Sequence, residues 1–314
     1  MSMTLAEIVG SARAELGLFP ISPSVVSSGA EIDQQMFYLV NQLGTELMQN
    51  GNWTALQSEH IITTETIIQT TGDLVDGSGV ISNIAAGTSL LAATTWVVTG
   101  NGIVTSARIA SIDSPTQVTL TELATDTAAG VALTFAKDTY PLPDDFQGFI
   151  SDTWWDRTNR WQLLGPSSPQ ADQFLRSGIV TTTPRRSWRQ IGRLANAWRA
   201  WPPPGTTDPR MTWEYEYNSL YWATDVNGVG KVRFSADTDT CVFPDAVMIA
   251  GLKMRFFDAK GMDTTVLRAT YERLLASARG SDGGASKLSM TGAKSGFHLL
   301  DYWNIPDGNF PAQS

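Results

Sequence analysis

Apolar residues recur at helical spacing in two stretches near the N-terminus. The first begins at Thr4, with Glu7 three residues on, and its apolar positions are Leu5, Ile8, Val9, Ala12 and Leu16. Thr and Glu at this spacing form a capping box, and Gly17 is a typical helix stop. The same order of features returns over residues 28–51, where Ser28 takes the capping position. These patterns predict two amphipathic helices joined as an αα-hairpin.

The chain from about 68 to 136 has a different pattern. Charged residues become sparse, Thr, Ser, Gly, Ala and Val dominate, and turn residues separate short runs with strand propensity. The runs are Val80–Ile84, Thr95–Val98, Arg108–Ile112, Gln117–Leu120 and Val131–Phe135. They predict a small all-β module. A strand is expected before it, over residues 56–66, so the module is interpreted as an insertion into a loop of the main domain.

After this module the pattern alternates and then returns to helical spacing. In Met211–Tyr217 every second residue from Trp213 on is aromatic, which predicts a half-buried antiparallel strand. Residues 168–176 begin Ser-Pro and predict a short helix. A broadly apolar helix is predicted over residues 244–259, and Asp263 is expected to cap a fourth helix. A helix so broadly apolar packs deeply or partly against another subunit.

The predicted fold class is α+β. We expect a four-helix core of two N-terminal and two C-terminal helices, an antiparallel β domain and an inserted small all-β module. The main domain is expected to be discontinuous, from residues 1–66 and 138–280, with the insert at 67–137. Residues 281–314 are rich in Gly and Ser and then aromatic, without helical or strand spacing. Such a tail has no core of its own, so we expect it to dock on another surface.

The composition excludes several classes of protein. With 314 residues, 42% of them hydrophobic, the chain is too apolar to be disordered. The single cysteine, Cys241, forbids an internal disulfide, and the two histidines, His60 and His298, leave little for zinc or a catalytic triad. No apolar stretch reaches the roughly 18 residues of a membrane-spanning helix, and the N-terminus lacks a signal-peptide pattern. We therefore expect no enzyme activity, no metal and no membrane contact.

Three short motifs resemble sites of chemistry but are incomplete. Gly228–Lys231 ends like a phosphate loop, yet Val232 stands where Ser or Thr must reach magnesium. Asp237-Thr-Asp239 begins like a calcium loop without the closing Glu. The adjacent carboxylates Asp144-Asp145 lie in a Pro-rich stretch that favours a turn or cap. We interpret all three as structural.

Charge is distributed unevenly along the chain, whose net charge is −9. Residues 1–150 are strongly acidic, which disfavours general nucleic-acid binding. Between Arg185 and Trp201, by contrast, five arginines are interleaved with three tryptophans. Arg with aromatic residues is typical of protein interfaces, but also of nucleic-acid contacts and of a solvated strand face; the acidic remainder of the chain favours a protein interface. The candidate partner-interface residues of this segment and the tail are Arg185, Arg186, Trp188, Arg189, Arg193, Trp198, Trp201, Phe297, Tyr302, Trp303 and Phe310.

Several short motifs, taken in order, resemble one family. They are Ala12–Gly17, Gly51–Leu56, Tyr140–Phe146, Ile150–Asp156, Leu164–Pro169, Phe234–Thr240, Ala259–Asp263 and Tyr271–Arg273. Their order is similar to that in the head–tail adaptor (connector) proteins of tailed bacteriophages, which include the tail tubular protein A, or gatekeeper. The motifs cover about 1–66 and 138–290. The insert is not part of the common core, although parts of it resemble small β modules of other virion proteins, and 192–201 is longer than the family pattern.

The resemblance implies a structural virion protein at the head–tail interface, assembled in the host cytoplasm. It implies a homo-oligomeric ring, usually of twelve subunits, between the portal protein and the tail nozzle or tail tube, with tail fibres as further neighbours. Double-stranded DNA passes through the channel of such a ring during packaging and ejection without sequence-specific binding. The resemblance implies no cofactor and no catalysis.

The sequence is also compatible with two other functions. One is a receptor- or carbohydrate-binding tail component, in which Trp96 of the insert would stack on a sugar ring. The other is a nucleic-acid-binding protein that uses the arginines between Arg185 and Arg199.

Overall fold

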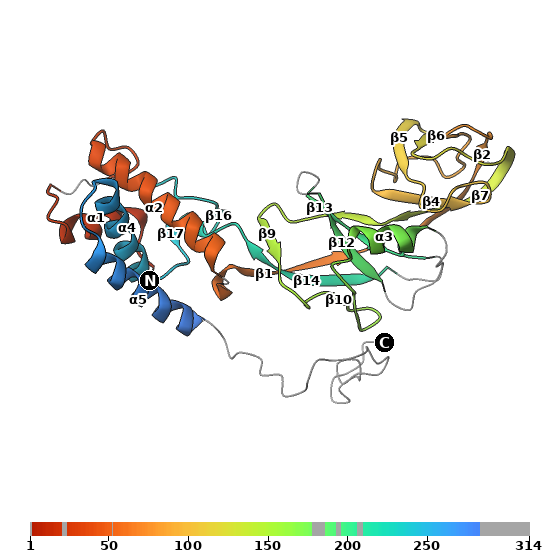
Figure 1. Cartoon of the computed structure of the whole chain (residues 1–314). Coiled ribbons are helices and arrows are strands. Elements are labelled where there is room, and N and C mark those ends of the chain that lie inside the picture. The colour runs from red at the N-terminus through yellow and green to blue at the C-terminus, as the bar shows by residue number, and fades with distance from the viewer. Residues whose placement is uncertain are drawn as a thin grey trace, which may run out of the picture. The chain divides into compact units, whose positions relative to one another are not determined.

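The computed structural model describes residues 2–20, 24–51, 53–177, 186–192, 196–205 and 210–282. They form a mixed α+β structure with five α-helices and several antiparallel sheets among these residues, which confirms the predicted class (Figure 1). The described chain divides into two compact units. Unit 1 consists of the chain up to Ser58, Asp145–Phe149, and the chain from Tyr217 onward. Unit 2 consists of Glu59–Asp144 and Ile150–Glu216. The division into the three predicted domains stays a prediction.

The helices of unit 1 come from both ends of the chain. They are α1 (Leu5–Glu15), α2 (Glu31–Asn50), α4 (Asp245–Ala259) and α5 (Thr265–Asp282). Helix α4 contacts each of the other three, and all four contribute side chains to one hydrophobic cluster (Figure 1). Three helical neighbours require apolar side chains on most sides of α4, which explains its broadly apolar sequence.

The helix ends follow the sequence at some positions and depart from it at others. Thr4 and Glu7 form the predicted capping box of α1. The predicted cap of α2 is wrong, because its N-cap is Ala30 and no side chain caps it. The Ser28 hydroxyl instead donates to the carboxylate of Asp33 at 2.6 Å. Asp33 is fully buried and paired with Arg13, so its remaining oxygen takes the hydroxyl that would otherwise cap the helix.

A close approach inside unit 1 gives a testable prediction. A Cβ at Gly44 of α2 would lie 2.5 Å from Cζ2 of Trp222, a ring with no exposed surface. Alanine is the better helix former by about 1 kcal/mol, but overpacking a closed core costs about 1–3 kcal/mol. We expect Gly44→Ala to lower the free energy of unfolding in urea. Gly280→Ala, at an exposed position of α5 with open space around it, is the matched control and should be neutral or stabilising.

Two of the incomplete motifs lie in or directly beside a small three-stranded sheet in unit 1. Its strands are β15 (Ala223–Thr224), β16 (Gly230–Lys231) and β17 (Thr240–Cys241), in the order β16-β15-β17. Gly228, at φ +80°, lies in the turn between β15 and β16, which the Asp225 carboxylate closes through backbone N–H groups. Asp239 accepts hydrogen bonds from Lys231 and from two backbone N–H groups. Both motifs are therefore structural turns, as predicted.

The largest sheet has the order β1-β14-β10-β11, with β9 also paired to β14. Its strands are β1 (Gln57–Thr63), which follows the 3-10 helix η1 (Thr54–Leu56), β9 (Phe146–Phe149), β10 (Trp155–Asp156), β11 (Trp161–Gln162) and β14 (Thr212–Ser219). Trp213, Tyr215 and Tyr217 are buried, whereas Glu216 between them is exposed. The predicted alternation in this strand is confirmed.

Another sheet, in unit 2, contains the described strands of the segment Arg185–Trp201, which we call the Arg/Trp segment. Its order is β12 (Ser187–Ile191), β13 (Ala197–Trp201) and β8 (Thr139–Pro141), all antiparallel. Helix α3 (Pro169–Arg176) contacts β13 and begins at the predicted Ser-Pro pair (Figure 1).

The predicted β module forms two three-stranded sheets around one hydrophobic cluster. One sheet has the order β2 (Ile68–Leu74), β7 (Ala128–Lys137) and β4 (Trp96–Gly100). The other has the order β3 (Val80–Ile81), β6 (Gln117–Leu120) and β5 (Ile109–Ser114). Side chains from both sheets, among them Ile81, Val98 and Phe135, share the cluster. All five predicted runs contribute to strands, whereas β2 was not predicted.

No helix of the described residues is both long and apolar enough to cross a membrane.

Candidate interaction surface

The Arg/Trp segment is divided between the two faces of its sheet. In the register of β12 and β13, Arg189 lies directly opposite Arg199, and Ser187 lies opposite Trp201. Side chains alternate between the faces along each strand, so Trp188 and Trp198 belong to the other face. The alternation therefore places Trp188 and Trp198 on the face opposite Arg189 and Arg199, whereas Trp201 shares the face of the arginines.

The tryptophans of that other face belong to an aromatic cluster in the interior of unit 2. Trp198 stacks on Tyr140, with ring centroids 5.2 Å apart, and Trp154 stacks on Trp188 at 4.1 Å and on Tyr215 at 4.2 Å. Trp198 has no exposed surface, and Trp188 is 4% exposed. As predicted interface residues these two are wrong, because their rings are buried within the subunit and offer no area to a partner.

The arginines gather on the opposite face, which helix α3 borders. Arg176 and Arg189 each lie 3.2 Å from the carboxylate of Asp172, which is nearly fully buried. Arg199 lies 3.6 Å from the carboxylate of Asp138, which is fully buried. We call Arg176, Arg189 and Arg199 the arginine face.

Among the described residues, the arginine face has more positive charge than the carboxylates that it contacts neutralise. Arg108 binds Asp138 with both terminal nitrogens, so four guanidinium groups share the carboxylates of Asp138 and Asp172. Burial, followed by the nearby charge of Arg108, lowers the pKa of Arg199 to about 10. Arg189 and Arg199 are also directly opposite like charges, an arrangement that destabilises a strand pair. An anionic group brought to this face would relieve that repulsion.

The remaining candidate residues occupy varied positions. Arg186 lies 4.0 Å from the carboxylate of Asp156. Trp201 is half-buried, and its indole N–H donates to the carbonyl of Leu175 at 3.0 Å. Six candidates lie outside the described residues: Arg185, Arg193, Phe297, Tyr302, Trp303 and Phe310.

Two other candidate sites, Trp96 and the pair Asp144-Asp145, have structural surroundings. Trp96 is 4% exposed within the cluster of the β module, so its ring cannot stack on a sugar in this conformation. Asp145 accepts hydrogen bonds from the hydroxyls of Tyr217 and Ser219 at 2.8 and 2.6 Å, whereas Asp144 is exposed. The adjacent carboxylates therefore do not form a pair, and Asp145 anchors the end of a strand as the turn interpretation predicted.

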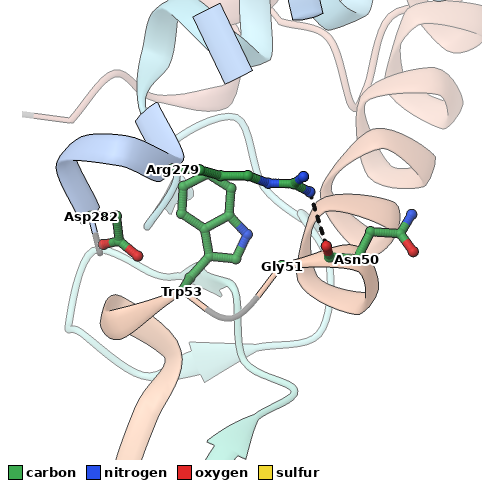
Figure 2. A pocket seen from close by; sticks show the side chains of 5 residues that line it. All are labelled: Asn50, Gly51, Trp53, Arg279 and Asp282. Atoms are coloured by element: carbon green, nitrogen blue, oxygen red, sulfur yellow. Dashed lines mark hydrogen bonds between the residues drawn. The ribbon is translucent and has the colours of Figure 1, made fainter. Parts of the chain in front are cut away.

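A cavity of about 260 Å³ lies in unit 1, lined by Asn50, Gly51, Trp53, Arg279 and Asp282 (Figure 2). Its charged groups are already engaged by the chain. Arg279 donates to the Asn50 carbonyl at the end of α2 at 2.9 Å, and the Asp282 carboxylate accepts hydrogen bonds from the backbone and hydroxyl of Thr54. The cavity therefore lies at a capped helix end, where the chain itself engages both charged side chains of the lining.

Within the described ranges, no group of His, Cys, Asp and Glu side chains has the arrangement of a metal site.

The thiol of Cys241 is buried, and burial raises its pKa to about 12. Since the thiolate is the reactive form, iodoacetamide should alkylate the folded protein at pH 8 at least about 100-fold more slowly than the protein in urea. Mass spectrometry of the alkylated cysteine measures this ratio. Equal rates in both states would contradict the buried position.

No protein-family model and no curated protein sequence matches the chain.

Proposed function

We propose that this chain is a structural virion protein, a head–tail adaptor that forms a ring between the portal and the tail nozzle or tail tube. The finer fold proposal is a four-helix core of α1, α2, α4 and α5, an antiparallel β domain and the inserted module at 67–137. The partners are other copies of the chain, usually twelve in the ring, the portal protein, the tail protein and tail fibres. Its place is the head–tail interface of the virion after assembly in the host cytoplasm.

The observation that carries the proposal is the sharing of one helical core by both ends of the chain. Helices α1 and α2 pack in one hydrophobic cluster with α4 and α5, and the described part of unit 2 is built from the chain between α2 and α4. The motifs that resemble the adaptor family lie in or directly after α1, α2 and α4, within α5, and in the loops and short strands between α2 and α4, in the order of the family pattern. A chain built this way holds its terminal helices in a fixed arrangement, as a ring subunit requires.

The charge of the chain supports the proposed path of DNA. The net charge is −9, and residues 1–150 hold most of the excess acid. An acidic surface repels phosphate groups, so DNA that passes along it stays hydrated and unbound.

Mixing the full chain with the portal protein of the same phage tests the proposal. Negative-stain images of the mixture should show a second ring stacked on the portal ring, whereas a portal from an unrelated phage should stay bare. A chain that leaves its cognate portal unchanged at every stoichiometry would contradict the adaptor function. Images of the chain alone are the control for rings that form without the portal.

A further inference from the structure

The arginine face is positioned to receive an anionic group from outside the subunit. The side chain of Arg189 is 33% exposed, and those of Arg176 and Arg199 are 19% and 17% exposed. Two half-buried apolar side chains, Ile191 and Trp201, lie on the same side of the strand pair as Arg189 and Arg199. A partner for this face therefore needs carboxylates beside a small apolar contact.

The chain itself carries a surface with that chemistry at one end of the β module. Val75 and Leu123 are 55% and 61% exposed, and the carboxylate residues Asp76, Glu122 and Asp126 next to them are exposed as well. We call these five residues the insert tip.

Backbone hydrogen bonds hold the two segments of the insert tip side by side. The N–H of Gly77 donates to the Ala124 carbonyl at 2.9 Å, and the N–H of Ala124 donates to the Ser78 carbonyl at 2.9 Å. The N–H of Asp76 donates to the Thr127 hydroxyl at 2.8 Å. The tip is thus preorganised, which reduces the entropy lost when it binds.

We propose that the insert tip of one copy of this chain binds the arginine face of the next copy. The inference rests on the proposed ring and identifies the contact that links its subunits. Because the two surfaces differ, the contact is heterologous, and repeated contacts of this kind close into a ring or extend as a filament. The carboxylates of the tip supply the negative charge that the arginine face lacks, and Val75 and Leu123 cover apolar area that water otherwise contacts.

A second copy fits this face better than DNA does. Duplex DNA needs an extended basic surface, whereas the arginine face consists of three partly buried arginines beside α3, in a chain of net charge −9. The exposed apolar side chains of the tip match a protein surface and contribute nothing to phosphate binding. DNA binding at the same arginines is a distinct outcome of the test below.

Two variants of the full chain separate the two halves of the contact. The face variant is R189E, in which Arg176 continues to pair with Asp172 and the new carboxylate lies opposite Arg199. The tip variant is D76N/E122Q, at two exposed positions, whose neutral amides form no ion pair with the new carboxylate of R189E. The matched control is R268E on α5, where an arginine side chain 56% exposed also pairs with an aspartate. Circular dichroism checks folding, and R189Q replaces R189E if the latter does not fold.

Sedimentation velocity of the purified chain measures the contact. The wild type and R268E should self-associate at about 0.05 M salt and dissociate toward about 0.5 M salt, because screening weakens exposed charge pairs. Each contact variant alone should associate at least about tenfold more weakly. An equal mixture of the two variants should give 1:1 dimers and nothing larger, since just one intact contact can form between an unaltered face and an unaltered tip.

Several results would overturn the inference. A wild type that stays monomeric at low salt, a mixture that stays monomeric, or an R268E chain that dissociates as the contact variants do would each do so. Wild-type binding to a fluorescent DNA duplex that R189E abolishes, with self-association unchanged, would assign the face to DNA instead. Portal binding is measured separately. A chain that stacks on its portal but fails the mixing test keeps the adaptor function and loses this contact, and the reverse result keeps the contact alone.

Discussion

Replacing Asp138 by alanine is expected to lower the free energy of unfolding of unit 2 by about 3–5 kcal/mol, because it leaves buried guanidinium groups without their counter-charge. Asp138 is fully buried and binds both terminal nitrogens of Arg108, with Arg199 3.6 Å away. Its backbone also joins two parts of the unit. Its N–H donates to the Thr95 carbonyl, and its carbonyl accepts from the N–H of Ala200.

Urea unfolding followed by tryptophan fluorescence measures the effect. The control is Asp144→Ala, since that carboxylate is exposed and its loss should leave the unfolding midpoint unchanged. A double replacement, Asp138→Ala with Arg108→Ala, should recover part of the lost stability, because it removes one of the unpaired charges together with the carboxylate. Equal midpoints for Asp138→Ala and the wild type would show that these arginines do not depend on Asp138.

The sequence was sufficient for elements whose determinants are local. The capping box at Thr4 and Glu7, the alternation of Trp213 and Tyr215, and the apolar length of α4 each act within one helix or strand. Those patterns depend on the 3.6- and 2-residue periods of the backbone, which a single segment reveals. The predicted α+β class follows from the same patterns.

Pairings between distant segments could not be predicted in the same way. The predicted cap of α2 is wrong because Ser28 donates its hydrogen bond to Asp33, which is paired with Arg13. No local sequence pattern predicts that an arginine of α1 lies beside an aspartate of α2. Strand β2 was missed because Ile68–Leu74 holds few apolar residues, and its pairing with β7 provides the hydrogen bonds that make it a strand.

The candidate site shows the same limit. The segment from Arg185 to Arg199 was recognised by composition, but composition does not assign residues to faces. The pairing of β12 with β13 places Arg189 opposite Arg199, and the pairing of β13 with β8 places Trp198 beside Tyr140 in the interior. The carboxylates that the arginines use, Asp138 and Asp172, lie in a loop and in a short helix. Trp188 and Arg189 are adjacent in the sequence, so a strand assignment for 187–191 would have placed these two side chains on opposite faces.

Replacing Trp198 by alanine is the second change with a large expected effect. We expect the free energy of unfolding to fall by about 3–5 kcal/mol, because a fully buried ring leaves a cavity that its neighbours cannot fill. The ring lies among four other aromatic side chains, with centroids 4.6 Å away at Trp154, 5.7 Å at Trp213 and 6.1 Å at Tyr215, besides the stacked Tyr140. Each aromatic contact adds about 0.5–1.5 kcal/mol beyond the buried area.

Trp198→Phe and Trp201→Ala make the test of Trp198 specific. Phenylalanine keeps a ring in the cluster, so Trp198→Phe should retain most of the stability, measured by urea unfolding with circular dichroism. Trp201 is half-buried on the opposite face. Trp201→Ala removes the same atoms as Trp198→Ala but should lower the free energy of unfolding by less. If Trp198→Ala lowered the free energy of unfolding no more than Trp201→Ala does, the ring of Trp198 would face solvent or a partner. That result would support the prediction that Trp198 is an interface residue.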